Sequence, residues 1–265
     1  MTHIKGLEWT FDKAADLYDR MRPGYPDELY QAIFDYIRIG PESSVVEVGS
    51  GAGQATSPLL RTGCRLISVE YGSSFADLLS EKYRDCPNFS VINGRFEETS
   101  LPNDSFDLVY SATAFHWVPE KEGYTKVFSM LRKGGAFARF ANHPFAAGND
   151  PDLCSEINGL YGEYYASYHN RKIETPKEYS DEEARTLADI ASAYGFTGIR
   201  YKMFKRERVF TASEYISLLG TYSDHIAIEE SIRTVFFSKV EEAIQRHGGT
   251  ITICDTIDLE LARKE

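Results

Sequence analysis

The residues best suited to chemistry lie in one short stretch, VVEVGSGAGQAT, and in the apolar run that follows it. Three glycines, Gly49, Gly51 and Gly53, stand at alternate positions directly after a β-branched run, and a single acid, Glu70, ends the next run, RLISVE. Closely spaced glycines allow positive φ and let a bulky ligand lie against bare backbone. An acid at the tip of the second strand accepts hydrogen bonds from a ribose diol. The pattern therefore predicts a nucleoside-containing ligand at two strand ends.

Two ligand classes fit this pattern, dinucleotides and S-adenosylmethionine. The dinucleotide fingerprint is GxGxxG or GxGxxA. Read from Gly49 it ends on Gln54, and read from Gly51 it ends on Thr56, so it is not completed in either frame. The hypothesis of a nicotinamide oxidoreductase is therefore disfavoured, and a failure to bind NAD would exclude it.

The elements that must position these residues alternate between two periodicities. Short β-branched runs indicate strands buried on both faces, and apolar residues at helical spacing indicate helices between them. Strands separated by helices at this spacing predict βαβ units and a parallel sheet. We expect strands at 43–49, 65–70, 89–93, 107–115 and 136–142, and helices at 27–38, 54–62, 73–85 (with a serine cap signal at its start) and 120–132 (stopped by Gly134-Gly135).

The alternation of strand and helix patterns stops after Pro144. Residues 145–180 are rich in Tyr, Asn, Gly and charge, which we interpret as a helical insertion or lid. Beyond it we expect a helix at 181–194, a strand at 199–210, mainly helix at 213–247 and a last strand at 250–262, with a possible break near Asp255.

Composition excludes several kinds of partner. The 29 basic and 40 acidic residues give 29 − 40 = −11, which argues against nucleic acid or an anionic membrane as partner, because phosphate neutralisation needs clustered Lys and Arg. No apolar run approaches the roughly 20 residues of a bilayer span, and the N-terminus does not read as a signal peptide. The four cysteines, none in CxxC spacing, favour a reduced cytoplasmic setting without a metal site.

The motif Glu47-x-Gly49-x-Gly51-x-Gly53 resembles the first signature of the class I S-adenosylmethionine-dependent methyltransferases, and the likeness extends from about residue 10 to about 142. The segment NGRFEETSLPNDSFDLVYSATAFHWV is similar to the family's third and fourth signatures, and MLRKGGAF resembles its turn before strand five. FHWV, together with YDRMRPGYP at 18–26, resembles a subgroup that includes trans-aconitate methyltransferase.

The resemblance implies a fold and a domain plan. The fold is α/β and Rossmann-like, with a seven-stranded, mostly parallel sheet, helices on both faces and an antiparallel last strand. The plan is one methyltransferase domain over 1–265, which comprises an N-terminal helical cap (1–40), a cofactor-binding core (41–144), the insertion or lid (145–180) and the rest of the sheet with its helices (181–265).

The resemblance also implies roles in binding S-adenosylmethionine. Glu47 would orient the amino-acid portion, the three glycines would line that portion by backbone, and Glu70 would hold the ribose. The alternatives, a strand-end acid and simple turn glycines, are weaker given the complete motif. Tyr71, which follows the ribose acid, is assigned to the same site.

The adenine is expected at Arg95 and Phe96, with the Phe96 backbone N–H serving the ring. Many relatives carry Asp where Arg95 stands, so the contact to the adenine amino group would fall to Glu97 or Glu98 instead.

Two further segments are assigned to the cofactor by resemblance. Ser111 and Ala112, after the fourth strand, would pass under the methionine part. Tyr18, Arg22 and Tyr25 would close over the cofactor, with Arg22 as partner of its carboxylate; the alternative for Arg22 is a solvated helix-end charge.

The acceptor side is less defined by the sequence. His116 follows the carboxyl end of the fourth strand and is the best candidate for a general base; the alternative is an aromatic plug formed with Trp117. Arg139 or His143, around the fifth strand, could contribute. The tyrosines at 161, 164, 165 and 168 have helical spacing, which favours packing over a substrate cage.

These features lead to a functional hypothesis. We expect a small-molecule methyltransferase that works by in-line transfer from a sulfonium, with the 145–180 insertion and the N-terminal segment forming the acceptor pocket. A carboxylate acceptor would need no base. An alternative is an S-adenosylmethionine-binding sensor or partner subunit without transferase activity. The oligomeric state, monomer or homodimer, is open.

Overall fold

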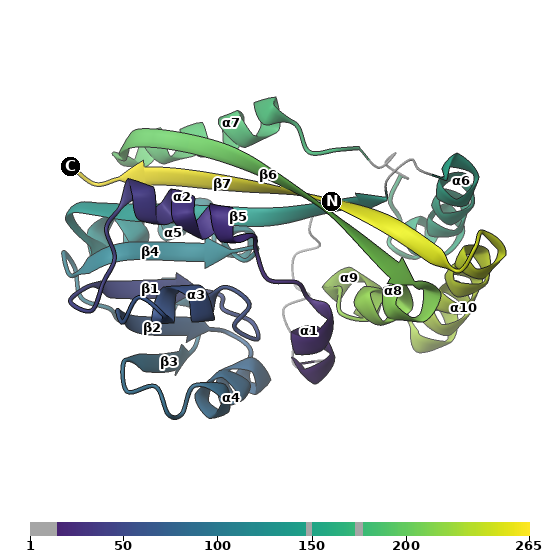
Figure 1. Ribbon diagram of the computed structural model, residues 1–265, viewed down its shortest axis with the longest axis horizontal. Helices are drawn as coiled ribbons and strands as arrows, with labels where there is room; N and C mark the ends of the chain where they lie inside the picture. The colour runs from purple at the N-terminus through teal and green to yellow at the C-terminus, as the bar shows by residue number, and fades with distance from the viewer. Residues whose placement is uncertain (1–14, 147–149, 173–176) are drawn as a thin grey trace. The chain divides into compact units, whose positions relative to one another are not determined.

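The computed structural model describes residues 15–146, 150–172 and 177–265 (Figure 1). These divide into two compact units. The sheet unit comprises Pro23–Asn142, Tyr179–Phe204 and Ile257–Glu265, and the helical unit comprises the described residues among 1–22, 143–178 and 205–256.

The strands of the described residues form a seven-stranded sheet in the order β3-β2-β1-β4-β5-β7-β6. The strands are β1 (Ser44–Val48), β2 (Arg65–Glu70), β3 (Phe89–Asn93), β4 (Phe106–Ala112), β5 (Leu131–Ala146), β6 (Thr197–Thr211) and β7 (Thr250–Arg263). The pairs β1–β2, β1–β4, β2–β3 and β4–β5 are parallel. Against β5, β7 runs in the opposite direction: Ala141 N donates to the Asp258 carboxylate, whereas Gly134 N donates to Lys264 O. This confirms the predicted mixed, mostly parallel sheet.

The strand order reverses between β1 and β4. Both strands continue into loops at their carboxyl ends, and Glu47 is opposite Tyr110 in their register. Open α/β sheets bind ligands in the crevice at such a switch point. The glycine loop and the loop after β4 both begin there.

Two apolar layers sandwich the sheet in the sheet unit. On one face, α2 (Asp27–Tyr36) and α3 (Thr56–Leu60) bury Leu29, Ile33 and Leu59 against the strands. On the other face, α5 (Glu120–Met130) and the 3-10 helix η5 (Ile190–Tyr194), which follows α7 (Asp181–Asp189), pack around Val127 and Phe137. The helix α4 (Ser73–Lys82) lies against β2 and β3. Because β1 is covered on both sides, it needs the near-continuous apolar run seen in the sequence.

The helical unit has a core of its own around the fully buried Phe236. Its helices are α1 (Ala15–Met21), α6 (Pro151–Leu160), the π-helix η4 (Tyr161–Ala166), α8 (Ala212–Leu219), α9 (Ser223–Ile226) and α10 (Glu230–Arg246). Asp150 begins α6 by accepting a hydrogen bond from Leu153 N, with Pro151 at the first helical position. Residues 151–166 are therefore helical, as expected for this segment, whereas its role as an insertion or lid stays a prediction.

Some local predictions were wrong. Ser73 does not cap α4, because Gly72 occupies the cap position without a side-chain bond. The fifth strand begins at Leu131 and includes Gly134 and Gly135, so α5 ends at Met130 and not at the glycine pair. The last strand runs unbroken from Thr250 to Arg263, through Asp255.

No helix within the described ranges combines the length and apolar character that spanning a bilayer requires. The four cysteines are free thiols. The proposed single domain and its internal boundaries stay a prediction.

Candidate functional site

The glycine loop after β1 has the backbone conformation that its sequence predicts. Gly49, Gly51 and Gly53 have φ values of 71°, 55° and 85°, a region that favours glycine. A Cβ on Gly49 would lie 2.4 Å from the Cβ of Ala114, which follows β4. The loop therefore needs glycine both for its left-handed turns and for the close approach of the β1 and β4 ends.

Glu70 lies at the end of β2 and is only 7% exposed. One carboxylate oxygen accepts the Gly51 N–H at 2.8 Å, and the other accepts the Gly72 N–H at 2.8 Å. Each carboxylate oxygen has a second lone pair that can accept from a ligand hydroxyl. The acid thus fixes the glycine loop and also provides acceptors at the strand tip. Tyr71, the next residue, is 45% exposed.

Glu47, at the start of the motif, is fully buried in β1. Its Oε2 accepts a hydrogen bond from the Thr56 hydroxyl at 2.6 Å, whereas its Oε1 has no partner in the described part of the chain. Burial raises the pKa of this carboxyl to about 7, and the Thr56 bond opposes that rise. An unsatisfied buried carboxylate oxygen is costly unless something completes it, and a cation does so best.

Arg95, Phe96 and Glu97 lie at the turn after β3, as expected. The Arg95 guanidinium stacks on the Tyr71 ring, 4.6 Å from its centroid, and lies 3.7 Å from the Glu97 carboxylate. Phe96 is buried and begins the 3-10 helix η2 (Phe96–Glu98), held by Lys126, whose ammonium donates to the Phe96 carbonyl. A hollow of about 330 Å³ opens at this turn, with Arg95 and Glu98 in its lining. The structure thus joins Tyr71 and Arg95 into one aromatic and cationic surface.

The loop after β4 closes the other side of the switch point. Ser111 is buried and its hydroxyl donates to Val48 O at 2.8 Å, and Ala112 is half-buried. Thr113 has φ 52°, which is unusual for a β-branched residue. Its hydroxyl pairs with the Tyr25 hydroxyl at 2.6 Å, so Tyr25 is brought to the β4 end.

His116 lies within the 3-10 helix η3 (Phe115–Trp117), just beyond β4, and is exposed. Its ring is tilted against Trp117, with centroids 5.3 Å apart, while the neighbouring Phe115 is buried. The exposed imidazole and its contact with Trp117 fit either interpretation, so the role of His116 stays a prediction. Arg139 is already engaged by Glu260 and by the Leu187 carbonyl.

Tyr18, Arg22 and His143 are not part of the sheet unit. Within the helical unit the Arg22 guanidinium donates to the Thr221 hydroxyl at 2.9 Å and lies 4.1 Å from the centroid of the Tyr222 ring. Its assignment to the cofactor carboxylate stays a prediction, as does that of Tyr18.

The tyrosines of the insertion contribute to packing. Tyr161 and Tyr165 join the core of the helical unit, and their hydroxyls pair with His225 and Asp224 at 2.9 and 2.7 Å. Tyr164 packs against the same core, in agreement with the packing interpretation, whereas Tyr168 is 42% exposed.

Sequence reasoning missed three residues that shape the site. Thr56 holds Glu47 from the start of α3, Tyr110 lies opposite it in register, and Thr113 links Tyr25 to β4. Thr113 could have been identified from its position, because it directly follows Ser111-Ala112 at a strand end that faces the glycine loop. Nothing in the sequence marked the partners of a buried Glu47.

The site suits a nucleoside sulfonium with an amino-acid tail. A Cβ at Gly49 would overlap Ala114 where the β1 and β4 ends meet, so this close approach needs glycine. Glu70 offers ribose acceptors, and the Glu47 oxygen that has no partner among the described residues suits an ammonium. These features fit S-adenosylmethionine better than a pyrophosphate, for which α3 (five residues) gives little helix dipole.

Comparison with known proteins agrees with this assignment. Residues 46–138 match the model of the family described as a methyltransferase domain. An uncharacterized methyltransferase-like protein of Schizosaccharomyces pombe is 24% identical over 234 residues, which cover 88% of this chain and 85% of the relative.

Two solved structures share the fold. The YcgJ protein from Bacillus has a TM-score of 0.56 at 17% identity, covering 91% of this chain and 99% of that one. The phosphoethanolamine N-methyltransferase 2 of Haemonchus contortus, solved with S-adenosyl-L-methionine, has a TM-score of 0.57 at 13% identity, covering 96% of this chain and 57% of that one. The fold is thus that of an S-adenosylmethionine-binding methyltransferase.

Proposed function

We propose that this chain, a class I S-adenosylmethionine-dependent methyltransferase by its domain at residues 46–138 and by its fold, methylates a small-molecule acceptor by in-line transfer. The observation that carries the proposal is the Glu70 carboxylate bonded to the Gly51 N–H at the switch point of the sheet. That bond ties Glu70 to the backbone of the glycine loop, which supports a role for both in holding one ligand.

S-adenosylmethionine, when bound, supplies a methyl group on a positively charged sulfur that needs no further activation. The chain's own task is to bind, orient and exclude water. Glu70 would accept from the ribose hydroxyls, and the glycine loop would lie against the methionine part. Glu47 would receive the ammonium through its orphaned oxygen. Tyr71 and Arg95 would cover the adenine, with the Phe96 N–H directed to its ring edge.

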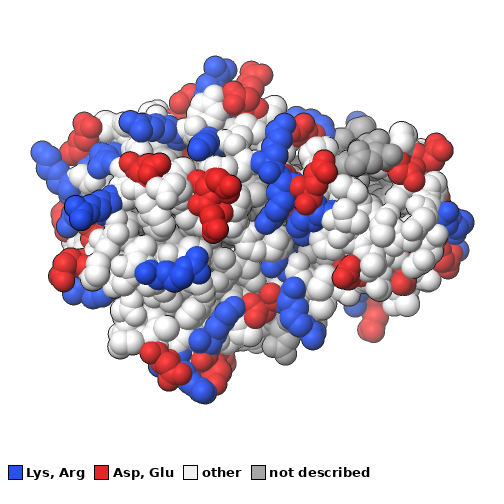
Figure 2. Space-filling model, in the orientation of Figure 1, with Lys and Arg blue, Asp and Glu red and all other residues white. Residues whose placement is uncertain are grey.

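A small acceptor is favoured over a nucleic acid by charge. The net charge is −11, and on the face shown in Figure 2 the basic side chains are interspersed with acidic ones. A nucleic-acid substrate would need clustered cations. We favour a carboxylate acceptor, on the likeness of FHWV and YDRMRPGYP to the trans-aconitate subgroup.

His116 is our proposed general base for acceptors that carry a proton. Its exposure beyond β4 leaves the imidazole accessible to a substrate. A base is needed only for a protonated nucleophile such as a phenol or an ammonium, and a carboxylate needs none. The acceptor class and His116 can therefore be tested together.

The first test is calorimetric titration with S-adenosylmethionine and S-adenosylhomocysteine, with NAD as the matched control ligand. We expect saturable binding of the first two and none of NAD. An absence of binding at millimolar ligand would end the proposal.

The second test follows S-adenosylhomocysteine formation with panels of carboxylic acids, phenols and amines. We expect turnover with a carboxylic acid, and that activity should be unchanged in His116→Asn. If only phenols or amines are methylated and His116→Asn loses that activity, the carboxylate acceptor is contradicted and His116 as general base is supported. Binding without turnover on any panel would instead favour a cofactor-binding sensor.

A further inference from the structure

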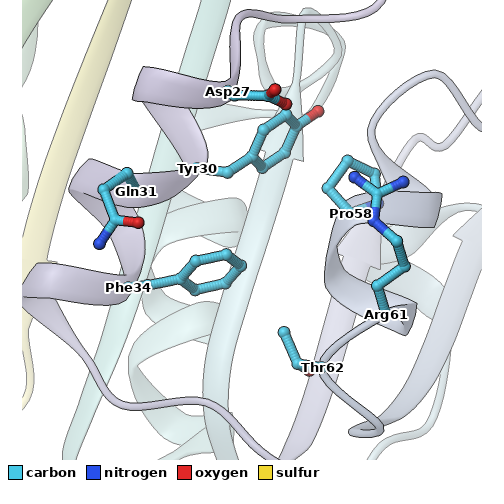
Figure 3. A pocket seen from close by; sticks show the side chains of 7 residues that line it. All are labelled: Asp27, Tyr30, Gln31, Phe34, Pro58, Arg61 and Thr62. Atoms are coloured by element: carbon cyan, nitrogen blue, oxygen red, sulfur yellow. The ribbon is translucent and has the colours of Figure 1, made fainter.

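A second pocket lies in the sheet unit, between α2 and α3. Its volume is about 290 Å³, and its walls include Asp27, Tyr30 and Phe34 from α2 and Pro58 and Arg61 from the α3 side (Figure 3). It contains none of the glycine loop, Glu70 or the turn after β3. The pocket is therefore distinct from the cofactor site described above.

Opposite charges stand on the two walls of this pocket. Asp27, exposed in the first turn of α2, faces the α3 side, where the exposed Arg61 guanidinium points back toward the cavity (Figure 3). Within the described residues, neither side chain forms an ion pair with the other or with any third group. A cation and an anion held apart in this way complement a molecule that carries both charges.

Tyr30 gives an independent sign of a ligand. Its side chain is 4% exposed, and its hydroxyl has no hydrogen-bond partner among the described residues. The ring packs edge-on against Phe140, a role that phenylalanine would fill without burying a hydroxyl. In Figure 3 the hydroxyl end of Tyr30 is directed past Asp27 toward the side of Pro58 and Arg61. It is suited to donate to an anionic group held by Arg61.

Size and lining restrict the ligand further. The volume is at the lower end of the roughly 300–1,000 Å³ of ligand pockets, so only a small molecule fits. Phe34 and Pro58 provide an apolar wall between the charges. This combination is the chemistry of an α-amino acid with a short apolar side chain.

We propose that the pocket between α2 and α3 is a binding site for a small zwitterionic amino acid. Arg61 and Tyr30 bind its carboxylate, Asp27 binds its ammonium, and Phe34 and Pro58 contact its side chain. This site goes beyond the proposed methyl transfer and does not depend on it.

The test adds three small molecules of similar shape but different charge to the full chain. L-leucine carries both charges, 4-methylpentanoate only the negative one and 3-methylbutylamine only the positive one. Amide resonances of uniformly ¹⁵N-labelled protein are followed during titration to 20 mM, with and without saturating S-adenosylhomocysteine. We expect saturable shifts around α2 and α3 with L-leucine, weaker by roughly tenfold with either single-charge probe because one charge-assisted contact is lost. The shifts should persist with S-adenosylhomocysteine present.

Variants assign the contacts. Arg61→Met should weaken L-leucine binding roughly tenfold, Asp27→Asn by a similar factor, and Tyr30→Phe roughly fivefold, as expected for charge-assisted and neutral hydrogen bonds. Glu28→Gln, an exposed neighbour of Asp27 outside the pocket, is the matched control and should change nothing. A thermal melt of each variant separates loss of binding from loss of folding.

Three outcomes would overturn the proposal. These are no saturable shift with L-leucine at 20 mM, equal binding of all three probes, and displacement of L-leucine by S-adenosylhomocysteine, which would assign it to the cofactor site. If the cofactor itself fails to bind, the L-leucine titration still decides this proposal, because it is also run without S-adenosylhomocysteine.

Discussion

Two carboxylates, Glu47 in the sheet unit and Asp224 in the helical unit, differ in how far their oxygens are satisfied. Glu47 is fully buried, whereas the Asp224 side chain is 18% exposed. One Glu47 oxygen is bound by Thr56 and the other has no partner among the described residues, and burial raises the pKa of this carboxyl to about 7. Asp224 in the helical unit accepts from the Tyr165 hydroxyl and from both the ring and the backbone N–H of His225. Although burial acts in the opposite direction, the contacts with His225 and Tyr165 hold the pKa of Asp224 well below its usual range.

The difference separates structural from binding groups. Satisfied polar clusters stabilise a fold, whereas an unsatisfied buried group costs stability unless a ligand completes it. Three buried atoms near α2 and the glycine loop have no hydrogen-bond partner within the described part of the chain: Tyr30 Oη, Glu47 Oε1 and Gln54 Nε2. Glu260 Oε1 of β7 and Thr256 Oγ1 of the helical unit share this property, so among these atoms only the first three lie near the proposed ligand sites.

The largest expected effect is on the cofactor. Glu70→Ala should weaken S-adenosylmethionine binding at least roughly 100-fold, because hydrogen bonds to a charged group contribute roughly 1.5–3 kcal/mol each. It also removes the Gly51 and Gly72 contacts that shape the loop. Calorimetry measures the affinity, with the exposed Asp77→Ala on α4 as control. An unchanged affinity would refute the ribose assignment.

The second prediction concerns the free energy of unfolding and compares two glycines that both have positive φ. Gly49→Ala should lower the free energy of unfolding by about 3 kcal/mol, from left-handed strain together with the overlap with Ala114. Gly134→Ala, with φ 82° and open space around its Cβ, should cost only about 1 kcal/mol. Urea unfolding checks both variants. Equal losses would mean that the close approach at Gly49 contributes nothing.

In the helical unit, Asp224→Asn should lower the free energy of unfolding by about 2 kcal/mol, the scale of a charge-assisted hydrogen bond, and leave cofactor affinity unchanged. Because the folded pKa of Asp224 is depressed, its contribution is present above the ordinary value of 3.8 and is lost as pH falls below it. Denaturant unfolding at pH 7 and at pH 3 should therefore show a smaller difference from wild type at pH 3. The control is Asp152→Asn, an exposed acid on α6. A large change in cofactor affinity would contradict a purely structural cluster.

The smallest expected effect is the release of protons when the cofactor binds next to Glu47. The folded pKa of Glu47, about 7, exceeds the ordinary 4.5, so its contribution to stability is full below 4.5 and lost as pH rises through about 7. An ammonium placed beside it would favour the ionised form, so cofactor binding near pH 7 should release up to about half a proton. Titrations in buffers of different ionisation enthalpy measure this number.

Two variants test whether that proton comes from Glu47. Glu47→Gln should abolish the release. Glu260→Gln alters another buried carboxyl whose pKa is raised to about 7 and should leave the proton release unchanged. Proton release that persists in Glu47→Gln would assign the linkage to a different group.

The sheet unit could be predicted closely because its signals are local. The run FSVIN forms β3 over the predicted residues, and RLISVE forms β2 with Glu70 at its tip. Three alternate glycines permit left-handed backbone, and all three adopt it in this loop. The alternation of strands and helices then predicts parallel strands without knowledge of any long-range contact, although not their order.

What could not be predicted depends on contacts between distant segments. Tyr25 meets Thr113 across 88 residues, and the positive φ of Thr113 comes from that packing and not from any preference of threonine. The end of α5 at Met130 shows the same effect, since pairing of Leu131 with Phe106 recruits the next residue into β5 before the glycine pair is reached. The partners of Arg22 likewise come from residue 221, far along the chain.

The division of the chain into its two units has a practical consequence. The backbone passes from one unit to the other after residues 22, 142, 178, 204 and 256, and three of these passages fall inside β5, β6 and β7. No single cut releases either unit as one continuous fragment. A truncated gene product would lack strands of the sheet, so expression trials should keep the chain whole, and insertions or tags belong at its ends.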